Sequence, residues 1–143
     1  MPKEIPKLQD SIKVAVVGAG NWGKNLVKNF YELGVLSAVV DENEGRLNKA
    51  GKDYKGVHLL TCLNDLWKMD ISAVAIATPA PTHYEITKTA LSKGKDVFVE
   101  KPFTLNTSEA EELVALAKSS GRIIMVGHLL LYQPAIRWIK DCI

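Results

Sequence analysis

The stretch VAVVGAGNWGKNLVKNF, residues 14–30, decides the expected fold. It begins as a short apolar run, typical of a buried strand, and leads directly into three glycines with the spacing GxGxxG, namely Gly18, Gly20 and Gly23. In this spacing the first glycine permits a tight turn, the second lets the backbone approach a diphosphate, and the third lets the following helix pack close to the strand. Free amides at the helix N-terminus then bind phosphate without basic side chains. Three glycines in a loop can also be mere turn residues, so the surrounding sequence has to support this interpretation.

Short apolar runs alternate with longer amphipathic stretches along the chain. The first run covers residues 12–17, and the others cover residues 35–40, 57–60, 71–77, 96–100 and 122–126. Because these runs are almost continuously apolar, they are typical of parallel strands covered by helices on both faces. The repeated strand–helix–strand order predicts right-handed crossovers. We therefore expect an α/β fold, a doubly wound parallel sheet of the Rossmann dinucleotide-binding type, over residues 12–128, preceded by an N-terminal extension at residues 1–11.

Two of the expected helices have recognisable ends. A capping-box pattern predicts that Thr82 caps a helix that ends near Gly94. The same pattern predicts that Ser108 caps a helix that ends near Gly121.

Composition and charge exclude several classes of protein. The chain has 143 residues, of which 47% are apolar, and a formal net charge of only +2, with no basic segment that would favour a nucleic-acid partner. No segment resembles a signal peptide or a membrane span, so we expect a cytoplasmic protein without a membrane partner. Cys62 and Cys142 are far apart and have no Cys/His cluster around them, so the sequence indicates neither a disulfide framework nor a metal site.

The second expected strand ends at Asp41, about twenty residues after the glycine loop, where a ribose-binding acid is expected. A carboxylate at this place accepts hydrogen bonds from the adenosine ribose and repels a 2′-phosphate, so the sequence favours NAD over NADP. The alternative is that Asp41 only starts a turn after the strand. Arg46 keeps NADP possible, because a guanidinium can compensate a phosphate or stack on adenine.

Ligands of a doubly wound sheet bind outside the carboxyl ends of the strands. The fourth expected strand is followed by TPAPTH, residues 78–83, in which the prolines stiffen a loop that has to pass near the cofactor. His83 falls in the first turn of the next helix. It either faces the cofactor crevice or is a packed or solvated histidine.

The fifth expected strand ends in Glu100, Lys101 and Pro102, where a buried run emerges into the crevice. A lysine beside a nicotinamide can polarise a substrate hydroxyl, which makes Lys101 the best catalytic candidate. Pro102 fixes the backbone that presents it and is a candidate for a cis peptide bond. The alternative is a surface ion pair between Glu100 and Lys101.

These motifs, in this order, resemble the Gfo/Idh/MocA family of nicotinamide-dependent sugar and polyol oxidoreductases. GAGNWG, the acidic end of the second strand, TPAPTH and above all EKP at residues 100–102 carry the resemblance, which spans nearly the whole chain. It implies that Lys101 contacts the reacting sugar on the nicotinamide side and that Thr78 and Pro79 line the cofactor cleft. We thus predict these cofactor-binding residues: Gly18, Gly20, Asn21, Trp22, Gly23, Asp41, Thr78, Pro79, His83, Glu100 and Lys101.

The segment GHLLLYQPA, residues 127–135, departs from the commoner family pattern, in which an asparagine and arginines follow the glycine. It resembles instead the branch that acts on nucleotide-linked amino sugars, the UDP-N-acetylglucosamine and UDP-N-acetylglucosaminuronate 3-dehydrogenases. This resemblance implies a sugar or UDP-sugar substrate, with His128 and Lys101 on the substrate side. The alternative is that His128 merely ends a strand.

The resemblance also implies a second domain that these residues do not contain. Members of the family have a further α+β domain that covers the cleft and contributes a catalytic D-x-x-x-H pair. Residues 129–143 are expected to start a helix near Pro134, and the sequence given ends within that helix. We therefore expect the cofactor domain of a longer, homo-oligomeric dehydrogenase, with little or no turnover by this chain and a monomeric state for it alone. The alternatives are a non-catalytic NAD(H)-binding or sensing module and, disfavoured because EKP and TPAPTH have no place in it, a methyltransferase.

Overall fold

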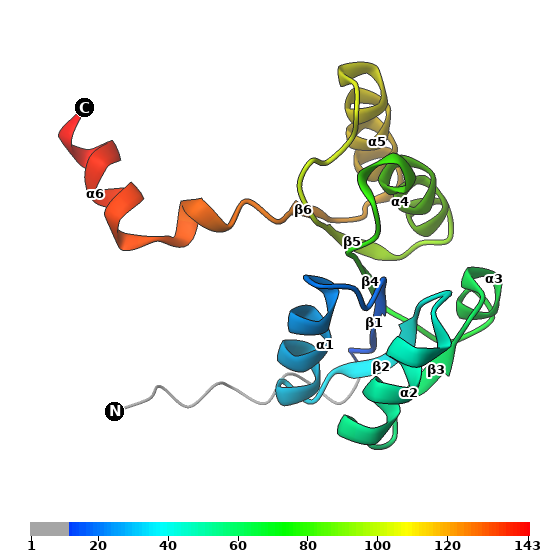
Figure 1. The fold of residues 1–143 in the computed structure, drawn as a ribbon. Coiled ribbons are helices and arrows are strands. Elements are labelled where there is room, and N and C mark those ends of the chain that lie inside the picture. Colours follow the sequence, from blue (N-terminus) through cyan, green and yellow to red (C-terminus); the bar gives the residue numbers. More distant parts are fainter. Residues whose placement is uncertain (1–11) are drawn as a thin grey trace.

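The computed structural model describes residues 12–143, and the expected extension at residues 1–11 lies outside these described residues. Six parallel strands form one sheet in the order β3-β2-β1-β4-β5-β6 (Figure 1). The strands are β1 (Val14–Val17), β2 (Leu36–Val40), β3 (His58–Leu60), β4 (Ala73–Ile76), β5 (Asp96–Val99) and β6 (Ile124–Val126). The helices are α1 (Gly23–Glu32), α2 (Glu44–Asp53), α3 (Leu63–Leu66), α4 (His83–Ser92), α5 (Thr107–Ser120) and α6 (Pro134–Cys142), together with the 3₁₀ turns η1 (Ala80–Thr82) and η2 (Leu129–Tyr132). The expected fold class and all six expected strands are confirmed.

The strand order creates a crevice at the centre of the sheet. Strands β1 and β4 are neighbours there. From β1 the chain continues outward to β2 and β3, whereas from β4 it continues in the opposite direction to β5 and β6. The loops that leave the carboxyl ends of β1 and β4 therefore diverge, and sheets of this kind bind ligands at such a point.

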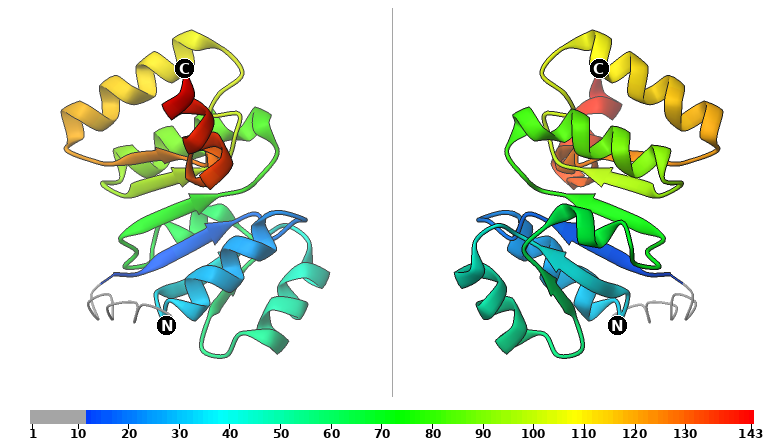
Figure 2. Two further views of the ribbon diagram at one scale, coloured as in Figure 1. Left: turned by 90° about the vertical axis from the view of Figure 1, so that its left-hand side faces the viewer. Right: turned by 90° about the vertical axis from the view of Figure 1, so that its right-hand side faces the viewer.

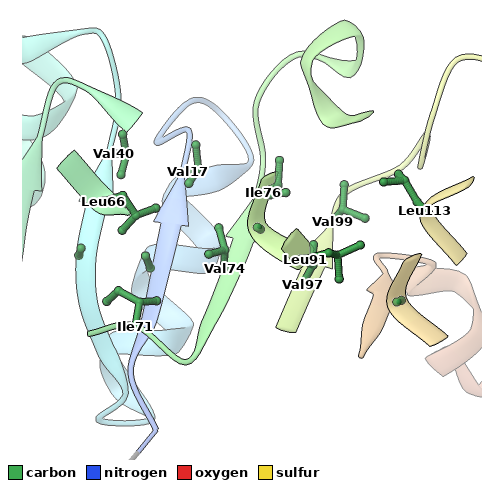
Figure 3. Packing of buried hydrophobic residues seen from close by; sticks show 14 residues of the cluster. Val17, Val40, Leu66, Ile71, Val74, Ile76, Leu91, Val97, Val99 and Leu113 are labelled. Carbon is green, nitrogen blue, oxygen red and sulfur yellow. The ribbon is translucent and has the colours of Figure 1, made fainter. Parts of the chain in front are cut away.

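Helices cover both faces of the sheet (Figure 2). On one face, α1 and α2 pack against the strands through Val27 and Leu47. On the other face, α3, α4 and α5 pack through Leu66, Leu91 and Leu113, as Figure 3 shows. Burial on both faces explains why the inner strands β1, β2, β4 and β5 are almost continuously apolar.

Two expected helix caps are wrong. The Thr82 hydroxyl does not cap α4 but donates to the carbonyl oxygen of Pro79 at 2.8 Å, because η1 adds a turn before the helix. The N-cap of α5 is Asn106, whose side chain accepts from the Glu109 amide at 3.0 Å, whereas the Ser108 hydroxyl donates to the Asn106 side chain. The expected ends are confirmed, since each helix is followed by a glycine with a positive φ.

The segment after β6 stands away from the sheet (Figure 1). Every residue from 128 to 143 is exposed, including the apolar side chains of Trp138 and Ile139. Helix α6 begins at Pro134, as expected. Among the helices of residues 12–143, none has the length and apolarity that crossing a membrane requires.

Candidate cofactor-binding site

The loop between β1 and α1 is so compact that two of its glycines cannot carry a side chain without conflict. Gly18 has a φ of +90°, and a Cβ there would lie 2.8 Å from the carbonyl oxygen of Ala77. A Cβ on Gly23 would lie only 1.8 Å from the carbonyl oxygen of Gly18. The tight turn and the close approach expected of these two glycines are therefore present, and they bring the start of α1 against the end of β4.

Gly20 differs from its two neighbours because it faces open space. A Cβ there would have only Arg46 Nη1 within 4 Å, at 3.9 Å. The residue lines a cleft at the end of β1. Since the described chain does not itself require a glycine here, the missing side chain fits a ligand that lies against the backbone.

The N-terminus of α1 presents unpaired amides beside Gly20. Within residues 12–143, the amide N–H groups of Gly20, Asn21 and Trp22 have no hydrogen-bond partner, no side chain caps the helix, and its first turn contains no acidic residue. Unpaired donors and the positive end of the helix dipole attract an anion. This arrangement fits the diphosphate of a dinucleotide, in agreement with the prediction from GxGxxG.

A cleft of about 780 Å³ opens at the carboxyl ends of β1, β2 and β4. Thr78 and Pro79, after β4, form part of its lining, as the sequence predicts. The loop after β3, including Cys62, forms another part that the sequence analysis missed. The rule that ligands lie at the carboxyl ends of strands, applied to β3 as well, would have identified it.

Asp41 lies at the end of β2, is only 8% exposed and lines the same cleft. Its carboxylate accepts from the Ala19 amide of the glycine loop at 2.7 Å and from the Asn43 amide at 2.9 Å. It therefore does start a turn, and it also holds the glycine loop. Arg46 Nη1 lies 3.4 Å from both carboxylate oxygens, so the negative charge is partly compensated from within the chain.

His83 is a packed histidine, which is one of the alternatives that the sequence left open, and a contact with the cofactor remains a prediction. The residue is 1% exposed, its Nδ1 lies 2.8 Å from the carbonyl oxygen of Pro102, and its Nε2 lies 2.8 Å from that of Thr78. Because η1 precedes α4, the first residue of the helix faces inward, beneath the loops after β4 and β5, and does not line the cleft.

The residues at the end of β5 separate into a buried acid and an exposed base. Glu100 is 7% exposed, and its carboxylate accepts a hydrogen bond from the indole N–H of Trp22. Nothing in the sequence indicated this contact, because the two residues are 78 positions apart. Lys101 is exposed, and the described chain gives its ammonium group no ion pair or hydrogen bond, so the alternative of a pair with Glu100 is wrong. The Lys101–Pro102 peptide bond is cis, as expected.

His128 follows β6 at the same edge of the sheet as the end of β5. It is exposed, and its amide donates to the carbonyl oxygen of Val126 at 2.7 Å. Because β5 and β6 are adjacent and parallel, His128 and Lys101 leave neighbouring strand ends. Its role on the substrate side remains a prediction.

A parallel sheet with this strand order, an uncapped helix after its first strand and an acid after its second defines a dinucleotide-binding domain of the Rossmann class. The chain belongs to the Gfo/Idh/MocA oxidoreductase family, whose NAD-binding Rossmann fold matches residues 12–128.

Relatives of known structure carry the same fold in longer chains. The sequence is 28% identical over 130 residues to UDP-N-acetylglucosamine 3-dehydrogenase from Acidithiobacillus ferrooxidans, covering 91% of this chain and 41% of that protein. A solved structure of that enzyme has a TM-score of 0.83 at 27% identity, over 92% of this chain and 43% of its own. The structure of GenD2 from gentamicin A biosynthesis, in complex with NAD, has a TM-score of 0.85 at 29% identity, over 94% of this chain and 39% of its own. A 3-ketoreductase from Actinomadura kijaniata, in complex with NADP and TDP-benzene, has a TM-score of 0.83 at 26% identity, over 92% and 42%. The chain thus spans about two fifths of the length of these relatives.

Proposed function

We propose that this chain is the cofactor-binding domain of a sugar or nucleotide-sugar dehydrogenase that transfers a hydride from a ring hydroxyl carbon to NAD. The observation that carries the proposal is the N-terminus of α1, where unpaired amides lie beside Gly20 at the edge of an open cleft. The relatives named above, a UDP-N-acetylglucosamine 3-dehydrogenase and a 3-ketoreductase among them, support the nucleotide-sugar class.

The chain's own residues would hold the cofactor from two sides. The amides of Gly20 and Asn21 would donate to the diphosphate, and the carboxylate of Asp41 would accept from the adenosine ribose. A hydrogen bond to a charged group of this kind is worth about 1.5–3 kcal/mol. Thr78 and Pro79 would form the opposite side of the cleft. When bound, NAD supplies the nicotinamide ring that accepts the hydride.

Lys101 would bind the reacting hydroxyl of the substrate. Its ammonium group is exposed at the end of β5 and has no partner within residues 12–143. From Nζ it can donate a hydrogen bond to the substrate oxygen and stabilise negative charge that develops there, while the hydroxyl proton would leave to an acceptor other than this ammonium group. His128 is the second candidate on the substrate side, because β6 lies next to β5.

The preference between NAD and NADP would depend on Asp41 and Arg46. The carboxylate disfavours a 2′-phosphate, and the guanidinium, 3.4 Å away and about half exposed, offsets part of that repulsion. We therefore infer tighter binding of NAD together with measurable binding of NADP.

Calorimetric titration of the chain with NAD, NADP and S-adenosylmethionine tests the cofactor. NAD should bind with the lowest Kd, NADP more weakly, and S-adenosylmethionine should not bind. Binding of the methyl donor alone would contradict the proposal and favour a methyltransferase.

A kinetic assay tests the catalytic role of Lys101. We expect this chain to bind NAD with little or no turnover, because its described residues place no cover over the cleft. In an enzyme that contains this domain, Lys101→Ala should lower kcat by about 100-fold to 10,000-fold, the usual contribution of a positioned acid–base group. Unchanged turnover in Lys101→Ala would contradict the proposed role of Lys101. If the wild-type protein that contains this domain showed no turnover, the result would favour the non-catalytic NAD(H)-binding module.

A further inference from the structure

The residues on both sides of Lys101 are held by side chains from other parts of the chain. Glu100 is buried and accepts a hydrogen bond from the indole N–H of Trp22, in the glycine loop. The carbonyl oxygen of Pro102 lies 2.8 Å from Nδ1 of His83. The side chain of Lys101 itself is exposed, and residues 12–143 offer it no partner. The backbone on both sides of Lys101 is therefore connected to other parts of the chain, whereas its ammonium group is free to reach a ligand.

His83 connects the segment Glu100–Pro102 to the lining of the cofactor cleft. Its Nε2 lies 2.8 Å from the carbonyl oxygen of Thr78, and Thr78 lines the cleft. His83 is 1% exposed, so the ring contacts both loops from inside the protein. An imidazole has its two nitrogens on opposite edges, so the ring lies between the two carbonyl oxygens and contacts both loops, although a neutral ring donates to only one of the two oxygens. A phenyl ring has no donor for either oxygen.

We propose that His83 is a positioning residue that couples the seating of the cofactor at Thr78 to the position of Lys101. The inference rests on the proposed function, because it takes the cleft as the cofactor site and Lys101 as the catalytic residue. A cofactor that holds the loop at Thr78 also holds Pro102 through the imidazole, and this orders the neighbouring lysine. The hydrogen bond from the Trp22 indole to the Glu100 carboxylate connects the glycine loop to the residue that precedes Lys101.

Thr87 provides a matched control on the same helix. It lies one turn after His83 in α4, is fully buried, and its hydroxyl has no hydrogen-bond partner within the described chain. Thr87→Val therefore changes a buried residue of the same helix without breaking a hydrogen bond. An effect that this variant shares with the His83 variants is an effect of packing, not of coupling.

Acetylation of the lysines in the full chain, followed by mass spectrometry with and without NAD, measures the coupling. In the wild type, NAD should slow acetylation of Lys101 but not of Lys118, in the last turn of α5. In His83→Gln and His83→Phe the protection of Lys101 should fall by roughly threefold to thirtyfold, the usual range of coupling within a domain. The affinity for ADP, which occupies only the adenosine half, should stay at the wild-type value, and Thr87→Val should retain full protection.

Each other outcome has a defined meaning. Full protection of Lys101 in both His83 variants would overturn the proposal, as would an equal loss in Thr87→Val. Loss of ADP binding in both His83 variants would also overturn it, because the ring would then support the whole fold and not this connection. Trp22→Phe removes the second connection without altering α4, and it should lower the protection as well. Failure of the wild type to bind both NAD and ADP would instead contradict the proposed function, and the coupling with it.

Discussion

The three glycines of the loop after β1 fall into two kinds. At Gly18 and Gly23, backbone atoms of the chain itself occupy the space of a Cβ. At Gly20 the space is open to the cleft, and under the proposed function the missing side chain leaves room for the cofactor. Fold stability and cofactor affinity should therefore respond differently to substitution at these positions.

Alanine substitutions separate the two kinds of glycine. Gly23→Ala should lower the free energy of unfolding by about 1–3 kcal/mol or more, because its Cβ would overlap the carbonyl oxygen of Gly18. Gly20→Ala should leave the free energy of unfolding unchanged or raise it by up to about 1 kcal/mol. The same variant should weaken NAD binding by about tenfold or more, since the new methyl group enters the cleft. Urea unfolding and calorimetry measure both quantities, and full NAD affinity in Gly20→Ala would refute the assignment.

At the scale of elements, apolar runs proved sufficient to predict the strands, but hydroxyl residues did not predict the caps. The six runs correspond to β1–β6, and burial on both faces accounts for the apolar side chains of the inner strands β1, β2, β4 and β5. Before α5, both Asn106 and Ser108 lie near a suitable acidic residue, and only the backbone conformation selects Asn106. Before α4, the turn η1 ends at Thr82, which keeps the N-cap position but has a helical backbone, and its hydroxyl donates back to the Pro79 carbonyl oxygen in place of capping the helix.

The cap of α5 can be tested by two alanine substitutions. Asn106→Ala should lower the free energy of unfolding by about 1 kcal/mol, because the Glu109 amide loses its acceptor. Ser108→Ala should cost clearly less, since the Ser108 hydroxyl only donates to the Asn106 side chain. Thermal or urea unfolding of both variants provides the comparison, and an equal or larger loss for Ser108→Ala would restore the cap expected from the sequence.

Helices α4 and α5 are joined by a polar cluster whose contribution depends on pH. Hydrogen bonds from Lys88 and from the Tyr84 hydroxyl lower the pKa of Glu112. A carboxylate with a lowered pKa in the folded state stabilises the fold above its unfolded pKa, and this contribution is lost as the pH falls through the folded pKa. Glu112→Gln should therefore be less stable than the wild type at pH 7, and the difference should shrink on acidification below about pH 4. Glu111→Gln is the control, and a difference for Glu112→Gln that does not depend on pH would contradict the assignment.

At the scale of the whole molecule, the strand order places the candidate residues at one edge of the sheet, and side-chain hydrogen bonds between distant residues connect the loops there. The sequence predicts the edge of the sheet at which Gly20, Asp41, Thr78 and Lys101 lie, because each follows a strand. It does not predict the bridges across that edge, such as the contacts of His83, because they join residues far apart in the chain and depend on the exact path of the loops.

The central claim is that a dinucleotide occupies the cleft. The two cysteines of this chain provide its most direct test. Cys62 is exposed and lines the cleft, whereas Cys142 is exposed at the end of α6, which stands away from the sheet. Alkylation with iodoacetamide, followed site by site by mass spectrometry, should show that NAD at about 100 times its Kd slows modification of Cys62 by about tenfold or more. The rate at Cys142 should not change. Equal rates at Cys62 with and without NAD would contradict the account.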